Sequence, residues 1–233
     1  MREYLNIILP LLAAGCVIGG GITLYFTYPL MAMKPAETGP VPDAGLPVTA
    51  LRSGKGALYF VDTGEGVLLI DTGTNADKVR DSMAATGIDP ADVKWVLLTH
   101  TDYDHVAALP LFENAEICMG EAELGLVRAG KKKLPGGISP DAVRPLKDGE
   151  ALLFGGVRVK CVAAPGHTAG STVYLLNDRF LFTGDALRYN NGRMSVHPYT
   201  KDKALAKASI EKIKGLADGV VLLTSHYGVH PGS

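Results

Sequence analysis

Short apolar runs separated by turn-forming residues recur along most of the chain and predict buried strands. Apolar or alternating runs near 57–62 and 67–70 flank Gly64-Glu65-Gly66, which is typical of a β-hairpin. Further strands are expected at 95–99 and 116–119, at several places between 144 and 183, and at 220–223. All of these runs are short and rich in branched and aromatic residues, which favours strands over helices.

Helical patterns separate the predicted strands. Residues 76–86 show such a pattern, with Thr74 or Asn75 able to cap the helix, and residues 121–129 and 202–216 show others. A short helix over 105–109, capped by Asp104, is also expected. Two halves, each made of strands followed by helices, predict an α/β sandwich of two sheets with helices outside.

The N-terminal segment predicts a membrane anchor. No charged residue lies between Glu3 and Lys34, and a helix over residues 4–33 is long enough to cross a hydrocarbon core of about 30 Å. Residues 1–33 are therefore expected to form a single transmembrane helix that contacts the lipid bilayer. A cleaved signal peptide and a lipoprotein processed before Cys16 remain as alternatives.

The anchor and the sequence after it define the expected domain organisation. Arg2 and the amino terminus are weak competition for Lys34, Arg52 and Lys55 on the far side of the anchor, so these charges do not fix its orientation. The tail of three residues before the anchor is easily retained in the cytoplasm, which favours an extracytoplasmic location for the domain that follows. Residues 34–47 contain four prolines and two glycines and predict a linker, which leaves residues 48–233 as one folded domain. The sequence gives no indication of the oligomeric state.

Composition narrows the range of functions. Of 233 residues, 47% are hydrophobic, which is enough to form a core. The formal net charge is −1, so the chain has no positive electrostatic field that would attract nucleic acid. Lys131-Lys132-Lys133 is the only basic cluster and is expected to be a solvated loop, with a contact to an anionic group as the alternative. Cys118 and Cys161 are expected to be buried, inert thiols, which leaves the compartment open.

Four apolar runs end in side chains that bind metals well. The segments that follow these runs are 99–105, 165–168, 183–185 and 225–227, and they hold four of the six histidines. A rigid strand that ends in a loop can hold a ligand still while leaving it open to solvent. The pattern predicts a metal centre along one edge of a layered α/β domain, although chance core and loop histidines are the alternative.

The spacing of these residues resembles a known family. His100-x-Asp102-x-Asp104-His105 resembles the HxHxDH signature of the metallo-β-lactamase-fold superfamily, with aspartate at the second histidine. His167, Asp185 and His226 match the later ligands of that family in order and in flanking residues, and Asp71-Thr72-Gly73 resembles its early aspartate-containing turn. The similarity covers roughly residues 47–228. It implies a four-layer αββα sandwich.

The resemblance also implies a site with two divalent ions. The implied ligands are His100, Asp102 and His167 for the first ion, Asp104, His105 and His226 for the second, and Asp185 as a bridge. Water shared by two cations loses a proton near neutral pH, so a metal-bridging hydroxide is the expected nucleophile. Asp104 is expected to be the catalytic residue that orients the hydroxide or passes a proton to the leaving group. Asp71 is expected to hold a metal ligand or the loop backbone in position without binding the metal itself.

Asp102 is where the chain departs from the family pattern. Zinc is the metal expected, but a third carboxylate adds negative charge and a hard oxygen ligand, so manganese or iron also fits. Flavodiiron oxidoreductases are similar here, with glutamate at this position. Alternatively, Asp102 is too short to reach the ion, which leaves one tight and one labile site.

The substrate-binding wall is expected between Asp185 and His226. The candidates there are Arg188, Tyr189, Asn190, Arg193, His197 and Tyr199. Among them, His197 could donate a hydrogen bond to a developing oxyanion. His230, close to the last residue, is expected to be exposed to solvent.

The resemblance favours a membrane-anchored, dinuclear metal-dependent hydrolase. Family members cleave esters, lactones, thioesters, amides or phosphoesters, so the fold does not choose among them. Seven residues follow His226, so we expect no added substrate-binding domain of the glyoxalase II kind and favour a small substrate. A di-iron oxidoreductase and a non-catalytic, membrane-tethered metal-binding module are the alternatives.

Overall fold

The computed structural model describes residues 33–42 and 45–231. The chain forms two compact units, Met1–Lys34 and Pro35–Ser233, and the second carries everything described below. Among the described residues, no helix has both the length and the apolar character needed to cross a bilayer. The anchor expected over 1–33, together with Cys16, lies outside the described residues except for Met33.

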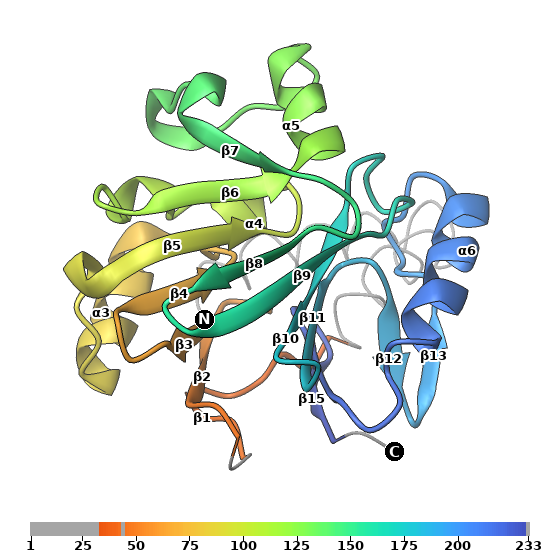
Figure 1. Ribbon diagram of the computed structural model, residues 1–233, viewed down its shortest axis with the longest axis horizontal. Helices are drawn as coiled ribbons and strands as arrows, with labels where there is room; N and C mark the ends of the chain where they lie inside the picture. The colour runs from red at the N-terminus through yellow and green to blue at the C-terminus, as the bar shows by residue number, and fades with distance from the viewer. Residues whose placement is uncertain (1–32, 43–44, 232–233) are drawn as a thin grey trace, which may run out of the picture. The chain divides into compact units, whose positions relative to one another are not determined.

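Two sheets dominate the second unit (Figure 1). The first sheet has its strands in chain order: β1 (Gly39–Pro40), β2 (Val48–Ser53), β3 (Gly56–Asp62), β4 (Val67–Ile70), β5 (Val93–Leu98), β6 (Glu116–Gly120) and β7 (Val143–Leu146). The strands β1 to β4 are antiparallel, whereas β4 to β7 are parallel.

The second sheet is mostly antiparallel. Its spatial order is β15 (Gly228–His230), β14 (Val221–Thr224), β11 (Phe180–Gly184), β10 (Thr172–Leu176), β9 (Val157–Ala163) and β8 (Ala151–Phe154). Only β11 and β14 run parallel to each other within it. A separate hairpin consists of β12 (Arg188–Asn190) and β13 (Arg193–Ser195).

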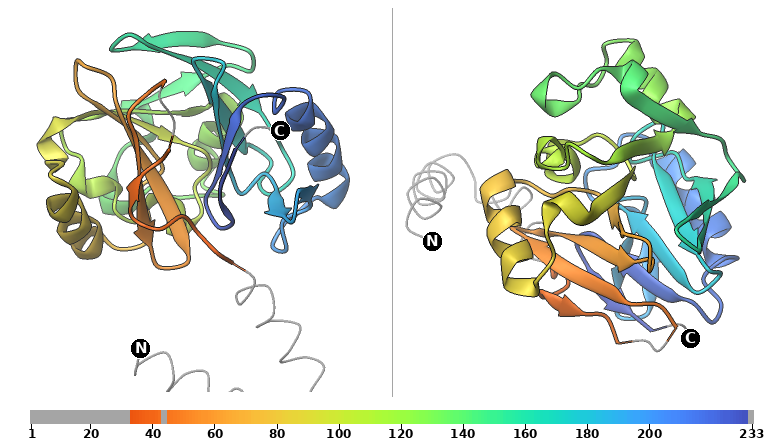
Figure 2. Two further views of the ribbon diagram at one scale, coloured as in Figure 1. Left: turned by 90° about the horizontal axis from the view of Figure 1, so that it is seen from below. Right: turned by 60° about the vertical axis from the view of Figure 1, so that its left-hand side comes forward.

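Helices cover the outer faces of both sheets. The helices are α3 (Ala76–Thr86), α4 (Tyr103–Val106), α5 (Glu121–Arg128) and α6 (Lys203–Lys214), with short 3₁₀ turns at Pro90–Asp92, Leu109–Leu111, Pro135–Gly137 and Pro140–Ala142. Figure 2 shows α3, in yellow, and α6, in blue, on opposite sides of the two sheets. The layers are therefore helix, sheet, sheet and helix.

Alternate residues of each strand pack into different layers of the core. In β4, Leu68 and Ile70 lie between the sheets, whereas Leu69 packs in the cluster that contains Val79 and Met83 of α3. In β10, likewise, some side chains face the other sheet and the others face α6. Strands buried on both faces must be apolar throughout, which explains the continuous runs in the sequence. The predicted αββα sandwich is confirmed.

Two buried tyrosines tie the sheets together beside the ends of the central strands. Tyr59 of β3 donates to the carbonyl oxygen of Thr224 at 2.7 Å, and Tyr174 of β10 donates to that of Leu98 at 2.7 Å. A buried phenol needs such a partner. Each bond crosses from one sheet to the other and fixes the end of a strand.

Most predicted elements agree with the structure, and the cap residues explain their ends. The helix over 76–86 is confirmed, with Asn75 accepting from Lys78 N at 3.0 Å. The helix predicted over 202–216 runs over Lys203–Lys214, because Asp202 is its cap. Cys118 and Cys161 are free and buried, as predicted, and burial raises the pKa of each thiol to about 12.

Three expectations are wrong. The short helix is Tyr103–Val106 rather than 105–109, and its N-cap position is Asp102, whose carboxylate makes no capping bond because it is engaged elsewhere. Part of the expected linker 34–47 belongs to the domain: β1 pairs with β2, and Val41 and Leu46 join the core between the sheets. His230 is only partly exposed, because it forms the end of β15 and bonds to the Tyr227 carbonyl at 2.7 Å.

Candidate metal centre

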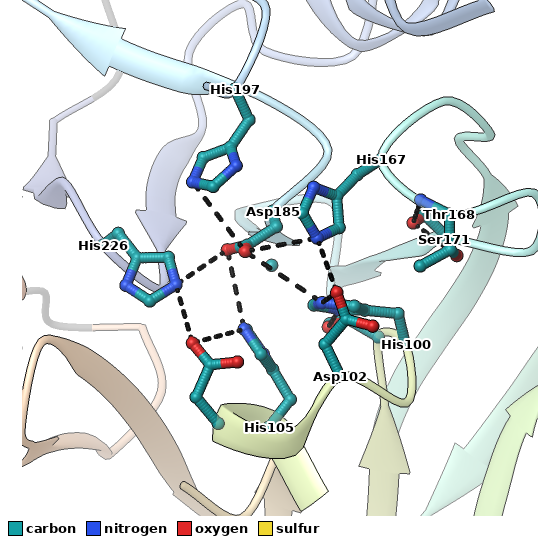
Figure 3. A network of polar contacts seen from close by, with 12 residues as sticks. His100, Asp102, His105, His167, Thr168, Ser171, Asp185, His197 and His226 are labelled. Carbon is teal, nitrogen blue, oxygen red and sulfur yellow. Dashed lines mark hydrogen bonds and ion pairs between the residues drawn. The ribbon is translucent and has the colours of Figure 1, made fainter. Parts of the chain in front are cut away.

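The side chains predicted to bind metal gather where the central strands end. Asp71 follows β4 and His100 lies just beyond β5, while Asp185 follows β11 and His226 lies just beyond β14. Since β4 and β5 are parallel, and so are β11 and β14, each pair of ends meets at one edge of its sheet. The loop after β9 adds His167 at the same place (Figure 3).

Asp185 lies at the centre of the group, with its two carboxylate oxygens facing different histidines (Figure 3). Its Oδ2 is 3.5 Å from His167 Nε2 and 4.0 Å from His100 Nε2. Its Oδ1 is 3.2 Å from His226 Nε2 and 3.6 Å from His105 Nε2. A carboxylate placed in this way can bind one cation with each oxygen.

The turn that leads into Asp185 requires a glycine. Gly184 has a φ of +50°, and a Cβ at this position would lie 2.4 Å from Thr99 Oγ1. Only glycine adopts this conformation without strain and leaves room for the neighbouring strand end. The position of the Asp185 carboxylate therefore depends on a local backbone feature as well as on its place after β11.

Asp102 completes the first set of donors. Its Oδ2 is 3.1 Å from His167 Nε2 and 3.8 Å from His100 Nε2, so the implied first set does lie together. Its Oδ1 pairs with the ammonium group of Lys132. The expectation that Lys131–Lys133 forms a solvated loop is therefore wrong for Lys132, whose side chain is 17% exposed.

Asp104 completes the second set. Its Oδ2 is 3.3 Å from His226 Nε2 and 3.8 Å from His105 Nε2. The side chain of Asp104 is 38% exposed, whereas that of Asp185 is 5% exposed. Asp104 is thus the carboxylate of this pair that solvent or a substrate can reach.

Contacts at the outer nitrogens aim the histidine rings at the centre. His105 Nδ1 contacts Asp71 Oδ2 at 2.8 Å, His100 Nδ1 contacts Thr99 Oγ1 at 3.0 Å, and His226 Nδ1 contacts the Lys55 carbonyl at 2.7 Å. An imidazole held at one nitrogen presents the other to a metal. Asp71 and Thr99 therefore define ring orientation without belonging to the cluster.

Unpartnered inner nitrogens show that the cluster fits metal ions. His100 Nε2 and His105 Nε2 are buried and have no hydrogen-bond partner among the described residues, and Asp185 Oδ1 is in the same position. Buried polar atoms without partners are rare and call for an explanation. Imidazole nitrogens and carboxylate oxygens are the ligands that zinc and similar divalent ions prefer. Such ions would satisfy these atoms.

Asp71 holds its position through a strained backbone. Its φ is 57°, a left-handed conformation that is uncommon for residues other than glycine. Its carboxylate accepts bonds from Thr99 N at 2.8 Å and Thr99 Oγ1 at 2.8 Å, besides its contact with His105. These bonds offset the strain and join the end of β4 to the end of β5.

Glu123 is a supporting residue that the sequence did not reveal. It is fully buried, and it accepts bonds from Thr101 N at 2.9 Å, Thr101 Oγ1 at 2.6 Å and Thr168 Oγ1 at 2.7 Å. The two threonines are neighbours of Asp102 and His167, so Glu123 links two ligand loops to α5. Gly170 permits this approach, because a Cβ there would lie 2.2 Å from Glu123 N.

The charges of the cluster are strongly coupled. Burial opposes ionisation of Asp185, but His226, His105 and His197 hold the pKa of its carboxyl well below the usual range. Burial likewise disfavours the charged form of His226, yet Asp185 and Asp104 raise the pKa of this imidazole to about 10. Without metal, His226 is therefore protonated, and it must lose this proton before its nitrogen can bind a cation.

Two substrate candidates lie beside the cluster. His197 is 1% exposed, and its Nε2 is 3.8 Å from Asp185 Oδ2. Tyr199 is 44% exposed, with its ring 5.8 Å from that of His197. Arg188 lies further out and stacks on Tyr227 at 5.8 Å, and Tyr227 in turn contacts the His197 ring at 5.8 Å.

The other candidates lie on the β12–β13 hairpin and are less closely tied to the cluster. Tyr189 packs against the ring of His230 at 4.1 Å, while Asn190 and Arg193 are exposed. The hairpin therefore brings the sequence around Arg188 near the centre but leaves its tip in solvent.

Comparison with known proteins identifies the family of this chain. Residues 53–226 match the family model described as the metallo-beta-lactamase superfamily. The chain belongs to this superfamily. It is 32% identical over 126 residues to a probable polyketide biosynthesis zinc-dependent hydrolase, BaeB, of Bacillus velezensis, covering 53% of this chain and 50% of that protein. It is 33% identical over 131 residues to a hydroxyacylglutathione hydrolase of Brucella anthropi, covering 52% and 46%.

Solved structures support the fold. The subclass B3 metallo-β-lactamase BJP-1 of Bradyrhizobium japonicum superposes with a TM-score of 0.63 at 23% identity, covering 81% of this chain and 79% of that one. At this identity the likeness shows the fold alone. The superfamily chain described here spans about half the length of the first curated relatives it matches.

Proposed function

We propose that this superfamily member is a metal-dependent hydrolase that uses two divalent cations to cleave a small substrate. The observation that carries the proposal is the position of Asp185, with one oxygen facing His100 and His167 and the other facing His105 and His226. The names of the matched relatives, a zinc-dependent hydrolase and a hydroxyacylglutathione hydrolase, support hydrolysis as the reaction.

The residues of the cluster have separable roles in this proposal. His100, Asp102 and His167 would hold one ion, and Asp104, His105 and His226 the other, with Asp185 shared. Bound ions supply Lewis acidity and lower the pKa of water, so that a nucleophile forms near neutral pH. Zinc is the metal we propose, and the oxygen of Asp102 also accommodates manganese or iron.

Asp104 is the residue we assign to proton handling. One of its oxygens faces His226 at 3.3 Å, and its side chain is the more exposed carboxylate beside Asp185. The interactions with His226 and His105 outweigh burial and lower the pKa of Asp104 to about 2. An ionised carboxylate at the open side can orient the attacking water and take up its proton.

The substrate class remains broad and defines the assay. The first substrates for a panel are a hydroxyacylglutathione and simple esters, followed by lactones, amides and phosphoesters. Tyr199, which is exposed beside the cluster, and Arg188, which lies further out, are the residues that such a substrate would meet.

The test uses the purified full chain, with metal content measured beside turnover. Asp104→Ala should lose nearly all hydrolysis while keeping the fold, and Asp62→Ala, at the exposed end of β3, is the matched control. Full turnover in Asp104→Ala would refute the assigned mechanism. Iron with oxygen uptake and no hydrolysis would favour a di-iron oxidoreductase, and bound metal without any turnover would favour a metal-binding module.

We also propose that residues 4–33 anchor the protein in a bilayer, with the catalytic domain on the extracytoplasmic side. The support is the sequence, which has no charge between Glu3 and Lys34. The full chain should sediment with membranes after a salt wash, whereas residues 36–233 should not. Release of the full chain by salt would refute an anchor. Protection of the catalytic domain from a protease added outside intact cells would refute the orientation.

A further inference from the structure

His197 is buried among the proposed ligands without satisfying either of its ring nitrogens. The side chain is 1% exposed, and neither Nδ1 nor Nε2 has a hydrogen-bond partner among the described residues. Its ring lies 5.0 Å from that of His167 and stacks on that of His226 at 5.6 Å. Figure 3 shows the imidazole pointing toward Asp185 from the side opposite Asp102.

Backbone hydrogen bonds hold this histidine in place. Thr200 N donates to the His197 carbonyl at 3.1 Å, which closes the turn, and Lys201 N donates to the His167 carbonyl at 3.4 Å. Asp202 N donates to the carbonyl of Gly166 at 2.9 Å. The loop that carries His197 is thus fastened to the loop that carries a proposed ligand. An imidazole held in this way, with both nitrogens unpartnered, calls for a partner from outside the protein.

The position of His197 indicates which ion that partner would be. Its Nε2 is 3.8 Å from Asp185 Oδ2, the oxygen that also faces His167 Nε2 at 3.5 Å and His100 Nε2 at 4.0 Å. Three imidazole nitrogens therefore surround one carboxylate oxygen. The donor atoms of His167, Asp185 and His197 all lie within 4.8 Å of one another.

Asp102 explains why an additional imidazole is useful at this ion. The family signature has histidine at this position, whereas the carboxylate here is 29% exposed and shares one oxygen with Lys132. One imidazole is missing from this side of the first ion, and His197 offers one from the other side. We propose that His197 is a direct ligand of the first ion and supplies the imidazole that the family signature places at residue 102. The inference rests on the metal centre of the proposed function.

A different role for His197 predicts a different result. If His197 only donates a hydrogen bond to the substrate, its loss should lower kcat and leave both ions bound. If it only fills space, an aromatic ring of similar size should replace it at no cost to the metal. Metal binding therefore separates a ligand from both other roles, even for a variant with no activity.

The experiment uses the full-length protein loaded with cobalt(II) or zinc, and His197→Phe, His197→Cys and His230→Asn variants. His230 is the matched control, because it is a partly buried histidine bonded to a backbone carbonyl outside the cluster. Chelator competition gives the dissociation constant of each ion, and the absorption spectrum of bound cobalt reports its ligands. We expect His197→Phe to raise the dissociation constant of the first ion by about tenfold or more. Loss of a residue that only supports a ligand already has an effect of about this size.

The cysteine variant keeps the test decisive if the phenylalanine variant folds poorly. A thiolate at residue 197 should restore the first ion and produce a thiolate-to-cobalt charge-transfer band that wild type and His230→Asn lack. Wild-type dissociation constants in His197→Phe, or the absence of this band in folded, cobalt-loaded His197→Cys, would overturn the inference. Absence of hydrolysis by wild-type protein that binds two ions would refute the proposed function instead.

Discussion

Glu123 offers the sharpest test of how the second sheet and α5 support the metal centre. Replacing it with alanine removes three hydrogen bonds of 2.6–2.9 Å, from Thr101 N, Thr101 Oγ1 and Thr168 Oγ1. Bonds to a charged group contribute about 1.5–3 kcal/mol each, but their sum overstates the loss because the burial cost of the carboxylate also disappears. We therefore expect a loss of about 3–5 kcal/mol, below the sum for three such bonds, because three buried donors lose their acceptor.

The expected loss translates into a measurable melting shift. At about 2–4 °C per kcal/mol for a domain of this size, Glu123→Ala should melt roughly 6–20 °C below wild type. Glu123→Gln should lose only about 1 kcal/mol, because its oxygen can keep both bonds from Thr101 while its amide meets the rotatable Thr168 hydroxyl. The control is Glu121→Ala, an exposed glutamate in the same helical turn.

Calorimetry in the presence of a chelator measures this effect without a contribution from bound metal. If Glu123→Ala has the same melting temperature as wild type or as Glu121→Ala, then this carboxylate does not fasten the loops that carry Asp102 and His167. A second readout is metal affinity, which should fall in Glu123→Ala because the loops carrying Asp102 and His167 lose their common attachment.

The remaining predictions concern the metal itself. Asp71→Asn should weaken metal binding about 10–100-fold, since His105 loses the carboxylate that orients it, whereas the exposed Asp62→Asn should not; equal constants from chelator competition would contradict this. Asp102→His should shift metal preference from manganese or iron toward zinc in a mixture of equal concentrations, with the order of substrates unchanged; an altered substrate order with the same metals would speak against a ligand at this position. Chelation should lower the melting temperature of wild type by roughly 8–16 °C, if zinc is present at about 1,000 times its dissociation constant, and an unchanged calorimetric trace would mean that the folded state binds no ion. The pKa of His226 in the metal-free centre is raised to about 10, so this imidazole is protonated at neutral pH and must lose the proton to bind metal. Metal affinity should therefore rise with pH. Calorimetric heats of metal binding that do not depend on the ionisation enthalpy of the buffer would exclude such proton release.

Local patterns explain why the sequence revealed so much of the fold. A strand such as β4 is apolar throughout because its alternate residues pack on different layers, and this pattern is visible without any tertiary information. The ends of α3 and α6 follow from Asn75 and Asp202, whose side chains bond to the first turn of their own helix. The proposed ligands could be recognised because they directly follow such strands.

Two of the supporting residues, Glu123 and Lys132, depend on contacts that no local pattern records. Glu121 and Glu123 occupy the same helical turn, and only the packing of the Thr168 loop on α5 makes one exposed and the other a buried acceptor. Lys132 is one of three adjacent lysines, and its pairing with Asp102 comes from the way the chain continues beyond α5. For the same reason Asp102 does not cap α4.

The layers, most element boundaries and most of the proposed metal ligands could be predicted from the sequence, because the period of burial and the order of residues after each strand are local properties. The tertiary structure alone decided which side of Asp185 each imidazole faces, and it placed His197 among the proposed ligands. The physical reason is that a buried polar side chain is defined by its partners, and these partners are brought together by loops far apart along the chain.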